Sequence, residues 1–258
     1  MYLLAVTVAL CVLPAPTGSS VDAFPLQPVS GVLFMGDSIA YDLAPAVETG
    51  LFVAGAGVQT FAFPGVSLTG DDWLQNGETW LADHIPVALL LSRANVVVWQ
   101  LSFWDADDSP VSHDENLLAH VAFAEVALRG RTAVVFVTPP PMDPTVIDPE
   151  GGPKDWNGLV GVALEVAERY PGRVFVVDSS GAWGDSYVEF AEDGTPLRKP
   201  DGVHVCPLGA TIFADFLVHW LADTFGGLEP TDTSAWPLSF WSDERYHRAP
   251  NACEDLRG

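Results

Sequence analysis

The chain has 258 residues, of which 48% are hydrophobic and 17% are charged; this composition is typical of a compact globular protein and excludes a disordered chain or a coiled coil. Eleven Lys and Arg residues stand against 34 Asp and Glu residues, which gives a formal net charge of -23 at pH 7. Because such a charge repels phosphate backbones and anionic lipid headgroups, it argues against a nucleic acid or a membrane surface as a partner.

The N-terminal segment is typical of an export signal. Residues 2–15 are apolar and uncharged, and the small and polar residues 16–20 follow them. This apolar run is shorter than the roughly 20 residues that span a bilayer. We therefore expect residues 1–20 to be a signal peptide and residues 21–258 to form one domain that is secreted or held in the cell envelope, with no stable membrane association after signal removal. A buried first strand and a lipoprotein signal at Cys11 are the alternatives.

The chain contains three cysteines. If Cys11 is removed with the signal peptide, Cys206 and Cys253 remain as a pair in an oxidising compartment, where a disulfide is the default expectation. Two separate buried thiols are the alternative. Neither residue lies in a CxxC or Cys/His spacing that is typical of zinc sites, so no metal site is predicted.

Short apolar runs rich in β-branched and aromatic residues alternate with longer helical patterns. The runs are continuous rather than alternating, as expected for strands covered on both faces. The predicted strands are Gly31 to Met35, Val58 to Phe63, Asn95 to Leu101, Thr132 to Val137 and Arg173 to Val177. The predicted helices lie near Tyr41 to Thr49, Thr79 to Ser92, Glu115 to Arg129, Asp155 to Tyr170 and Leu208 to Thr224. The repeated order of strand and helix predicts a parallel sheet in a single α/β domain, followed by an irregular aromatic tail from Gly226 onward.

Chemistry in such a sheet lies at the carboxyl ends of the strands. At the first of these ends, Gly36, Asp37 and Ser38 follow a predicted strand and precede a helix. A serine there has its hydroxyl at the edge of the sheet and its backbone N–H at a helix N-terminus, where negative charge is stabilised. A helix-capping role alone is the alternative.

A second junction of a loop with a helix carries Asp201 and His204. A spacing of three in a turn lets the Asp201 carboxylate bind one imidazole nitrogen of His204 and leaves the other nitrogen free to face Ser38. The sequence therefore contains a weak nucleophile, a base and an orienting acid. An ordinary buried histidine and an unrelated turn aspartate are the alternative.

These residues resemble the motifs of the SGNH, or GDSL, hydrolase family. Ser38 matches the first block of the family, and Asp201 with His204 matches the last block in spacing and in distance from the C-terminus. Gly65, in the segment Pro64 to Ser67, resembles the second block, whose glycine gives a backbone N–H to the oxyanion hole. The resemblance implies a flavodoxin-like three-layer α/β/α sandwich with a five-stranded parallel sheet, and acyl-ester chemistry through Ser38 without a metal or organic cofactor.

The third block departs from the family pattern. The family usually has a Gly, a variable residue, an Asn and an Asp after the third strand, and this chain reads Ser-Phe-Trp-Asp at 102–105. Trp104 stands at the position of the Asn, and its indole offers one N–H in a much larger ring than the amide. Trp104 is therefore either a third oxyanion donor or a wall of the pocket. We expect Asp37, Trp104 and Asp105 to line the substrate pocket.

The sequence thus predicts a secreted serine esterase. Ser38 is the nucleophile, His204 the base and Asp201 the group that orients the base, while the backbone N–H groups of Ser38 and Gly65 bind the oxyanion. The substrate is expected to be a small-molecule or carbohydrate ester, because the resemblance extends to SGNH modules of envelope acyltransferases, where a Cys follows the catalytic His as Cys206 does here. Acyl transfer to a cell-envelope sugar and a catalytically silent carbohydrate-binding module are the alternatives.

Overall fold

The computed structural model describes residues 25–69, 87–88, 91–106, 113–129, 133–146, 156–236, 241–248 and 252–253. The predicted signal peptide, residues 1–20, lies outside the described residues. Of the predicted helix Thr79 to Ser92, only residues 87–88 and 91–92 are described, and these four are helical.

The centre of the molecule is a five-stranded parallel sheet with the order β2-β1-β3-β4-β5. The five strands lie within a residue or two of the predicted runs: β1 Gly31–Gly36, β2 Gly57–Ala62, β3 Val96–Gln100, β4 Ala133–Val137 and β5 Val174–Val177. Every residue of β1, β3 and β4 is buried, whereas β2 at the edge is partly exposed. The continuous apolar runs are therefore explained by layers that cover both faces of the sheet.

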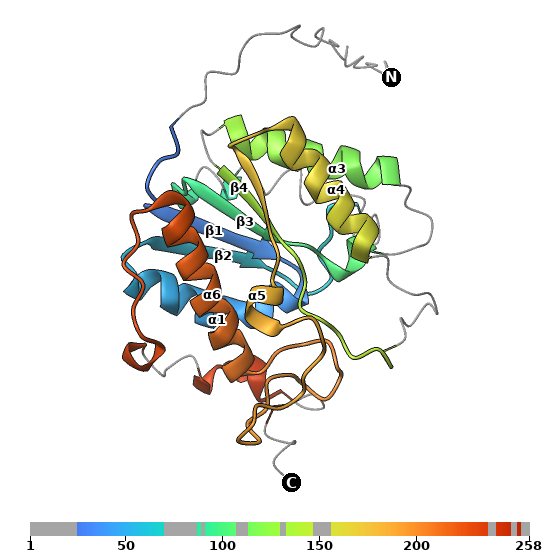
Figure 1. The fold of residues 1–258 in the computed structure, drawn as a ribbon, viewed down its shortest axis with the longest axis vertical. Helices are drawn as coiled ribbons and strands as arrows, with labels where there is room; N and C mark the ends of the chain where they lie inside the picture. The colour runs from blue at the N-terminus through green and yellow to red at the C-terminus, as the bar shows by residue number, and fades with distance from the viewer. Residues whose placement is uncertain are drawn as a thin grey trace, which may run out of the picture.

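Helices form the two outer layers (Figure 1). They are α1 Ser38–Val53, α3 His113–Arg129, α4 Trp156–Arg169, the short α5 Ser180–Trp183, and α6 Pro207–Phe225. Figure 1 shows α1 and α6 on one side of the sheet and α3 and α4 on the other. Helix α1 starts three residues before the predicted Tyr41, because Asp37 caps it. No helix in the described ranges is long and apolar enough to cross a membrane.

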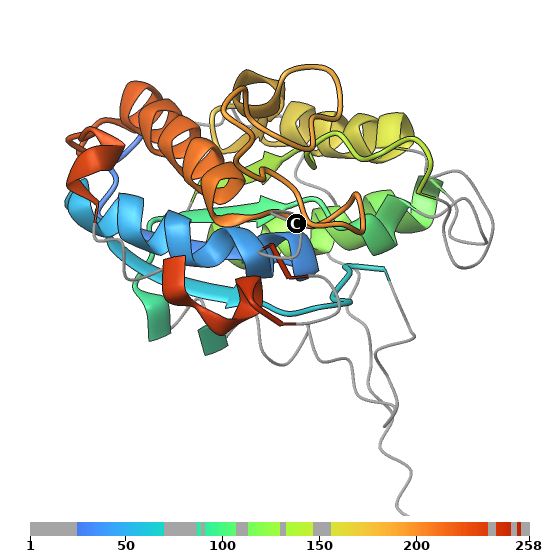
Figure 2. The ribbon, with the colours of Figure 1, turned by 90° about the horizontal axis from the view of Figure 1, so that it is seen from below.

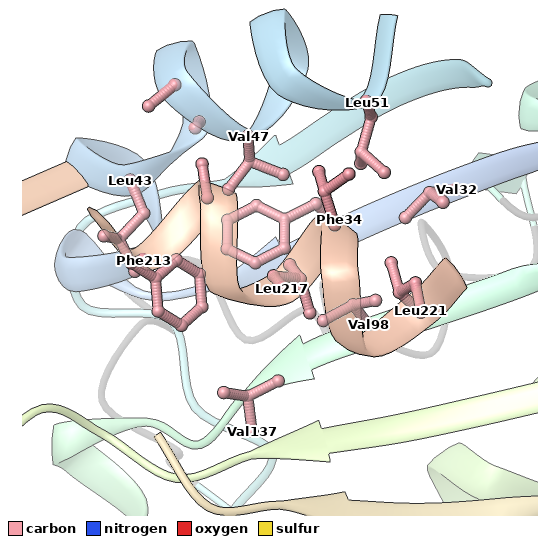
Figure 3. Close-up of a cluster of buried hydrophobic side chains, with 14 of the residues drawn as sticks. Val32, Phe34, Leu43, Val47, Leu51, Val98, Val137, Phe213, Leu217 and Leu221 are labelled. Carbon is pink, nitrogen blue, oxygen red and sulfur yellow. The ribbon is translucent and has the colours of Figure 1, made fainter. Parts of the chain in front are cut away.

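One core cluster joins the sheet to α1 and α6 (Figure 3). Phe34 of β1 lies in its centre beside Val47 of α1 and Leu217 of α6, and its ring centroid is 6.4 Å from that of Phe213. Each fully buried side chain of this size contributes about 1.5–3 kcal/mol. This packing fixes the first turns of α1 and α6 relative to the sheet, and these are the turns that carry or follow the predicted site residues.

The C-terminal tail is attached to this layer by a disulfide and by aromatic side chains. Cys206 and Cys253 are bonded, with their Cα atoms 5.7 Å apart, so the predicted pair is confirmed. Trp236 is 4% exposed and Tyr246 is buried completely, and the Tyr246 hydroxyl donates to the Asp42 carbonyl at 2.5 Å. In Figure 2 the tail, drawn in red, lies against α1. The tail therefore covers the α1 and α6 layer, from Trp236 beside Gly50 of α1 to Cys253 at the start of α6.

The strand order reverses between β1 and β3, because the chain leaves β1 toward β2 on one side and returns to β3 on the other. In open α/β sheets, the crevice outside the carboxyl ends of the strands at such a point is where ligands bind. The predicted nucleophile follows β1, Gly65 follows β2, and Trp104 follows β3. The topology thus brings three of the four predicted motifs to one edge of the sheet.

Candidate active site

Ser38 lies at the sharp junction of β1 with α1. Asp37 caps the helix by accepting the N–H of Ile39 at 2.9 Å. Gly36 has φ of +150°, and a Cβ at this position would lie 2.7 Å from Cβ of Ala40, so the turn requires glycine. The half-buried Ser38 is the first helical residue, and its backbone N–H has no acceptor within the helix. An oxyanion donor is therefore available next to the serine hydroxyl.

The predicted dyad of His204 and Asp201 is formed. Nδ1 of His204 lies 2.8 Å from Oδ2 of Asp201, and Oδ1 of Asp201 accepts the backbone N–H groups of His204 at 2.9 Å and Val203 at 3.0 Å. The side chains of His204 and Asp201 are 28% and 22% exposed. Because the carboxylate is held by three donors, it fixes the ring orientation and leaves Nε2 as the basic atom.

Electrostatics favour the ion pair within this dyad. Burial alone would raise the pKa of Asp201, but the hydrogen bond and charge of His204 outweigh it and lower the pKa to about 2. Burial alone would lower the pKa of His204, but the hydrogen bond that its ring donates to Asp201 and the charge of Asp42 outweigh it and raise the pKa above 6.5. The imidazolium that forms when His204 accepts a proton is thus stabilised.

Residues 198–205, which we call the dyad loop, are held by a buried arginine that sequence reasoning missed. The Arg198 guanidinium is 1% exposed and donates to the carbonyls of Pro141 at 2.7 Å, Val203 at 2.5 Å and His204 at 3.3 Å. It also lies over the ring of Trp183. Burial lowers its pKa to about 10, so it remains a cation at neutral pH. The one available signal was an Arg-Lys pair just before the motif in a strongly acidic chain.

The structure brings Ser38 and the dyad loop to the same edge but does not join them directly. Across the described residues, neither the Ser38 hydroxyl nor Nε2 of His204 makes a hydrogen bond. The link between the two elements is an ion pair of Asp42, four residues after Ser38 in α1, with Lys199 of the dyad loop, at 2.8 Å. Hydrogen bonds between catalytic groups are often long without substrate and tighten when it binds.

Ser102 connects the three loops that follow β1, β2 and β3. Its buried hydroxyl lies 3.1 Å from Oδ2 of Asp37 and 2.7 Å from the carbonyl of Val66, and it accepts the backbone N–H of Trp104 at 3.1 Å. Gly65 precedes Val66 in the turn after β2, and its N–H makes no hydrogen bond within the described ranges. Ser102 therefore sets the relative position of the two backbone donors predicted for the oxyanion hole.

Asp37 and Asp105 differ from the expectation that they line the substrate pocket. They are 0% and 1% exposed. Asp105 accepts the N–H groups of Leu68 and Thr69, at 2.9 and 3.0 Å, and the Thr69 hydroxyl at 2.8 Å. Both carboxylates are therefore buried, and they stabilise turns by accepting backbone N–H groups. Trp104 is 42% exposed, and both of its expected roles, as a wall of the pocket and as an oxyanion donor, stay predictions.

Other features of the described surface do not supply a competing site. An apolar groove of about 680 Å³ runs along β2 and the outer face of α1, past Phe52 and Val58, and no predicted catalytic residue lines it. Within the described ranges, no group of three His, Cys, Asp or Glu side chains is arranged to hold a metal ion. The dyad beside the start of α1 is therefore the candidate site.

The chain is similar to known proteins in structure but not in sequence. No protein-family model matches the chain, and no curated protein matches it in sequence. Solved structures do match. Est24, a carbohydrate acetylesterase from Sinorhizobium meliloti, is 17% identical with a TM-score of 0.55, and the match covers 76% of this chain and all of that one. An aryl esterase from M. smegmatis is 16% identical with a TM-score of 0.53, over 76% of this chain and 99% of that one.

A protein from Parabacteroides merdae that is described as a GDSL-like lipase is 14% identical with a TM-score of 0.53, and the match covers 78% of this chain and 97% of that one. The chain therefore has the three-layer α/β/α fold of the SGNH hydrolases, as the resemblance of its motifs implied.

Proposed function

We propose that the protein is a secreted serine esterase that hydrolyses O-acyl esters through Ser38, His204 and Asp201. The observation that carries the proposal is the hydrogen bond of 2.8 Å between Nδ1 of His204 and Oδ2 of Asp201, in a loop that is ion-paired to the helix that Ser38 begins. The SGNH fold and its esterase neighbours support the same reaction class.

In the acylation step, Oγ of Ser38 attacks the ester carbonyl carbon while Nε2 of His204 takes the hydroxyl proton. The carbonyl oxygen becomes an oxyanion, which the backbone N–H groups of Ser38 and Gly65 bind. When the carbon–oxygen bond to the alcohol breaks, the His204 imidazolium gives its proton to the leaving alcohol. Asp201 stabilises that imidazolium throughout and remains ionised, in keeping with its low pKa.

In the deacylation step, water takes the place of the alcohol. His204 removes one proton from the water, the resulting hydroxide attacks the acyl-enzyme, and the second tetrahedral intermediate collapses. Ser38 recovers its proton from the imidazolium, and a carboxylic acid is released. A sugar hydroxyl in place of water would give the acyltransferase alternative with the same residues.

The substrate class we propose is an acylated carbohydrate or another small ester. The half-exposed Trp104 beside the site supplies an aromatic face of the kind on which sugar rings pack. The similarity to a carbohydrate acetylesterase supports a carbohydrate ester as the first substrate to test. Residues 1–20 would direct the protein out of the cell, where such polymers are found.

A covalent probe tests the proposal. A fluorophosphonate should label the folded protein at Ser38, and Ser38→Ala should remove both the label and at least about 10⁴-fold of the activity on acetyl esters. Activity should be measured on p-nitrophenyl esters of increasing chain length and on an acetylated polysaccharide. A folded wild type that takes no label would overturn the esterase and favour the binding module.

A further inference from the structure

Asp42 and Lys199 form a buried ion pair that the triad itself does not use. Their side chains are 3% and 10% exposed, and Oδ2 of Asp42 lies 2.8 Å from Nζ of Lys199. Burial raises the pKa of Asp42, and the charge and hydrogen bond of Lys199 oppose this, so loss of either partner would leave the other buried without compensation. One partner belongs to α1, four residues after Ser38, and the other belongs to the dyad loop, five residues before His204.

The backbone around Lys199 transmits its position directly to His204. The Lys199 N–H donates to the His204 carbonyl at 2.8 Å, and Arg198 and Val205 form an antiparallel bridge on either side of this bond. Movement of Lys199 therefore moves the backbone that carries the imidazole. The ion pair is the point at which that backbone is attached to the helix of the nucleophile.

The C-terminal tail contacts both residues of the ion pair. Nζ of Lys199 also donates to the Arg245 carbonyl at 2.9 Å, and the Tyr246 hydroxyl donates to the Asp42 carbonyl at 2.5 Å. The Arg245 guanidinium lies 4.2 Å from the centre of the Tyr41 ring and donates to the Tyr41 carbonyl. Three separate segments thus converge on one charged contact next to the site.

We propose that Asp42 and Lys199 are positioning residues for the reaction, whose buried ion pair holds the His204–Asp201 dyad against the helix that Ser38 begins. The inference rests on the proposed serine-esterase function. It goes beyond that function because neither residue touches the reacting atoms and neither belongs to the sequence motifs of the site.

The charges around the imidazole give this role a signature in the pH profile. Asp201 faces His204 from its own loop, Asp42 from α1, and Lys199 and Arg198 from the start of the dyad loop. From the tail, the Tyr246 hydroxyl donates to the Asp42 carbonyl and the Arg245 carbonyl accepts from Lys199. The charge of Asp42 raises the pKa of His204 and that of Lys199 lowers it. Asp42→Asn removes the first effect and leaves the second, so the pKa of His204 should fall.

The test compares Asp42→Asn, Lys199→Met and the double variant with the wild type. Asp42→Asn should lower kcat/KM by roughly 10- to 100-fold, mostly in kcat, as a misplaced catalytic group does, and it should move the rising limb of kcat/KM to lower pH. The double variant should recover much of the thermal stability lost in the single variants, because no charge is then buried without its partner. Its kcat should remain low.

Glu165→Gln is the matched control. Glu165 of α4 is also paired across two helices, with its Oε1 2.9 Å from Nε2 of His113 in α3. Glu165→Gln removes one negative charge, as Asp42→Asn does. It should leave both kcat and the pH limb unchanged. If Asp42→Asn is folded and keeps the wild-type limb and kcat, the inference is wrong.

If a single variant does not fold, the kcat and the stability of the double variant decide the test. If its kcat returns to the wild-type value together with its stability, the ion pair is only structural and the inference is wrong. Failure of the proposed function has a different result, since Ser38→Ala would then retain activity. An inactive Ser38→Ala beside a fully active double variant would reject the positioning role alone.

Discussion

The protonation of His204 should control activity near neutral pH. In the proposed mechanism the neutral imidazole is the base, and the hydrogen bond that its ring donates to Asp201 and the charge of Asp42 outweigh burial and raise its pKa. As the pH rises through this pKa, His204 loses its proton and kcat/KM should increase, with the midpoint of the limb above 6.5. The measurement is kcat/KM from pH 5 to 9 on a neutral ester. A flat profile, or a midpoint below 6.5, would contradict the assignment.

Trp104 tests how many oxyanion donors the site has. Trp104→Phe keeps most of the ring and deletes the indole N–H. Because Trp104 is 42% exposed and the proposed site already uses two backbone donors, we expect KM to rise while kcat changes by less than about threefold. A donor role would instead lower kcat by about 10²- to 10³-fold. Steady-state kinetics on one acetyl ester separate the two outcomes, with Trp156→Phe on α4 as the control.

At the residue scale, the sequence was informative where function is local. Asp201 and His204 are three residues apart, so their contact depends on one turn, and the motif spacing was sufficient to predict it. The structural roles of Ser102 and Arg198 were not predicted, because their partners are distant in the chain. Ser102 contacts Asp37 across 65 residues, and Arg198 contacts Pro141 across 57. No local pattern contains such pairings.

At the scale of elements, the strands were predicted well because burial on both faces leaves continuous apolar runs. Helix boundaries were less certain, and α1 shows why. It begins at Ser38 rather than Tyr41, because the Asp37 side chain caps it, and it ends at Val53 rather than Thr49. The prediction that Asp37 and Asp105 line the pocket was wrong for a related reason. Their carboxylates satisfy buried backbone donors, and only tertiary structure reveals those donors.

The disulfide joins two elements on which the site depends. Cys206 is the N-cap residue of α6, two residues after His204, and the N–H of Cys253 donates to the Tyr246 carbonyl at 2.9 Å. With a sequence separation of 47, closing this loop is worth about 4 kcal/mol on the chain-entropy model. Cys253→Ser should therefore lower Tm by on the order of 10 °C.

Activity in the same variant reports on the tail. We expect kcat of Cys253→Ser to fall at temperatures well below its Tm, because the tail segment with Arg245 and Tyr246 supports Lys199 and Asp42. The double variant Cys206→Ser/Cys253→Ser controls for a free reactive thiol and should behave alike. Unchanged Tm and kcat in both variants would show that the bond does not hold the tail.

At the scale of the whole molecule, the net charge of -23 should make stability depend on salt. Mutual repulsion destabilises a compact state of high charge, and raising the ionic strength from 0.01 to 1 M shortens the Debye length from about 30 Å to about 3 Å. The Tm at pH 7 should therefore rise continuously with NaCl. Differential scanning calorimetry across this range measures the effect.

The same titration near the pI of about 4.2 separates charge screening from a general salt effect. The dyad should remain formed at that pH. A carboxyl whose pKa is lowered on folding stabilises the protein at pH values above its pKa in the unfolded chain, which is 3.8 for Asp201. This contribution of Asp201 is lost only as the pH falls toward about 2. The raised pKa of His204 means that its pairing stabilises the protein most at low pH. With the net charge near zero, NaCl should raise Tm much less than at pH 7. An equal rise at both pH values would mean that charge repulsion does not limit the stability of this fold.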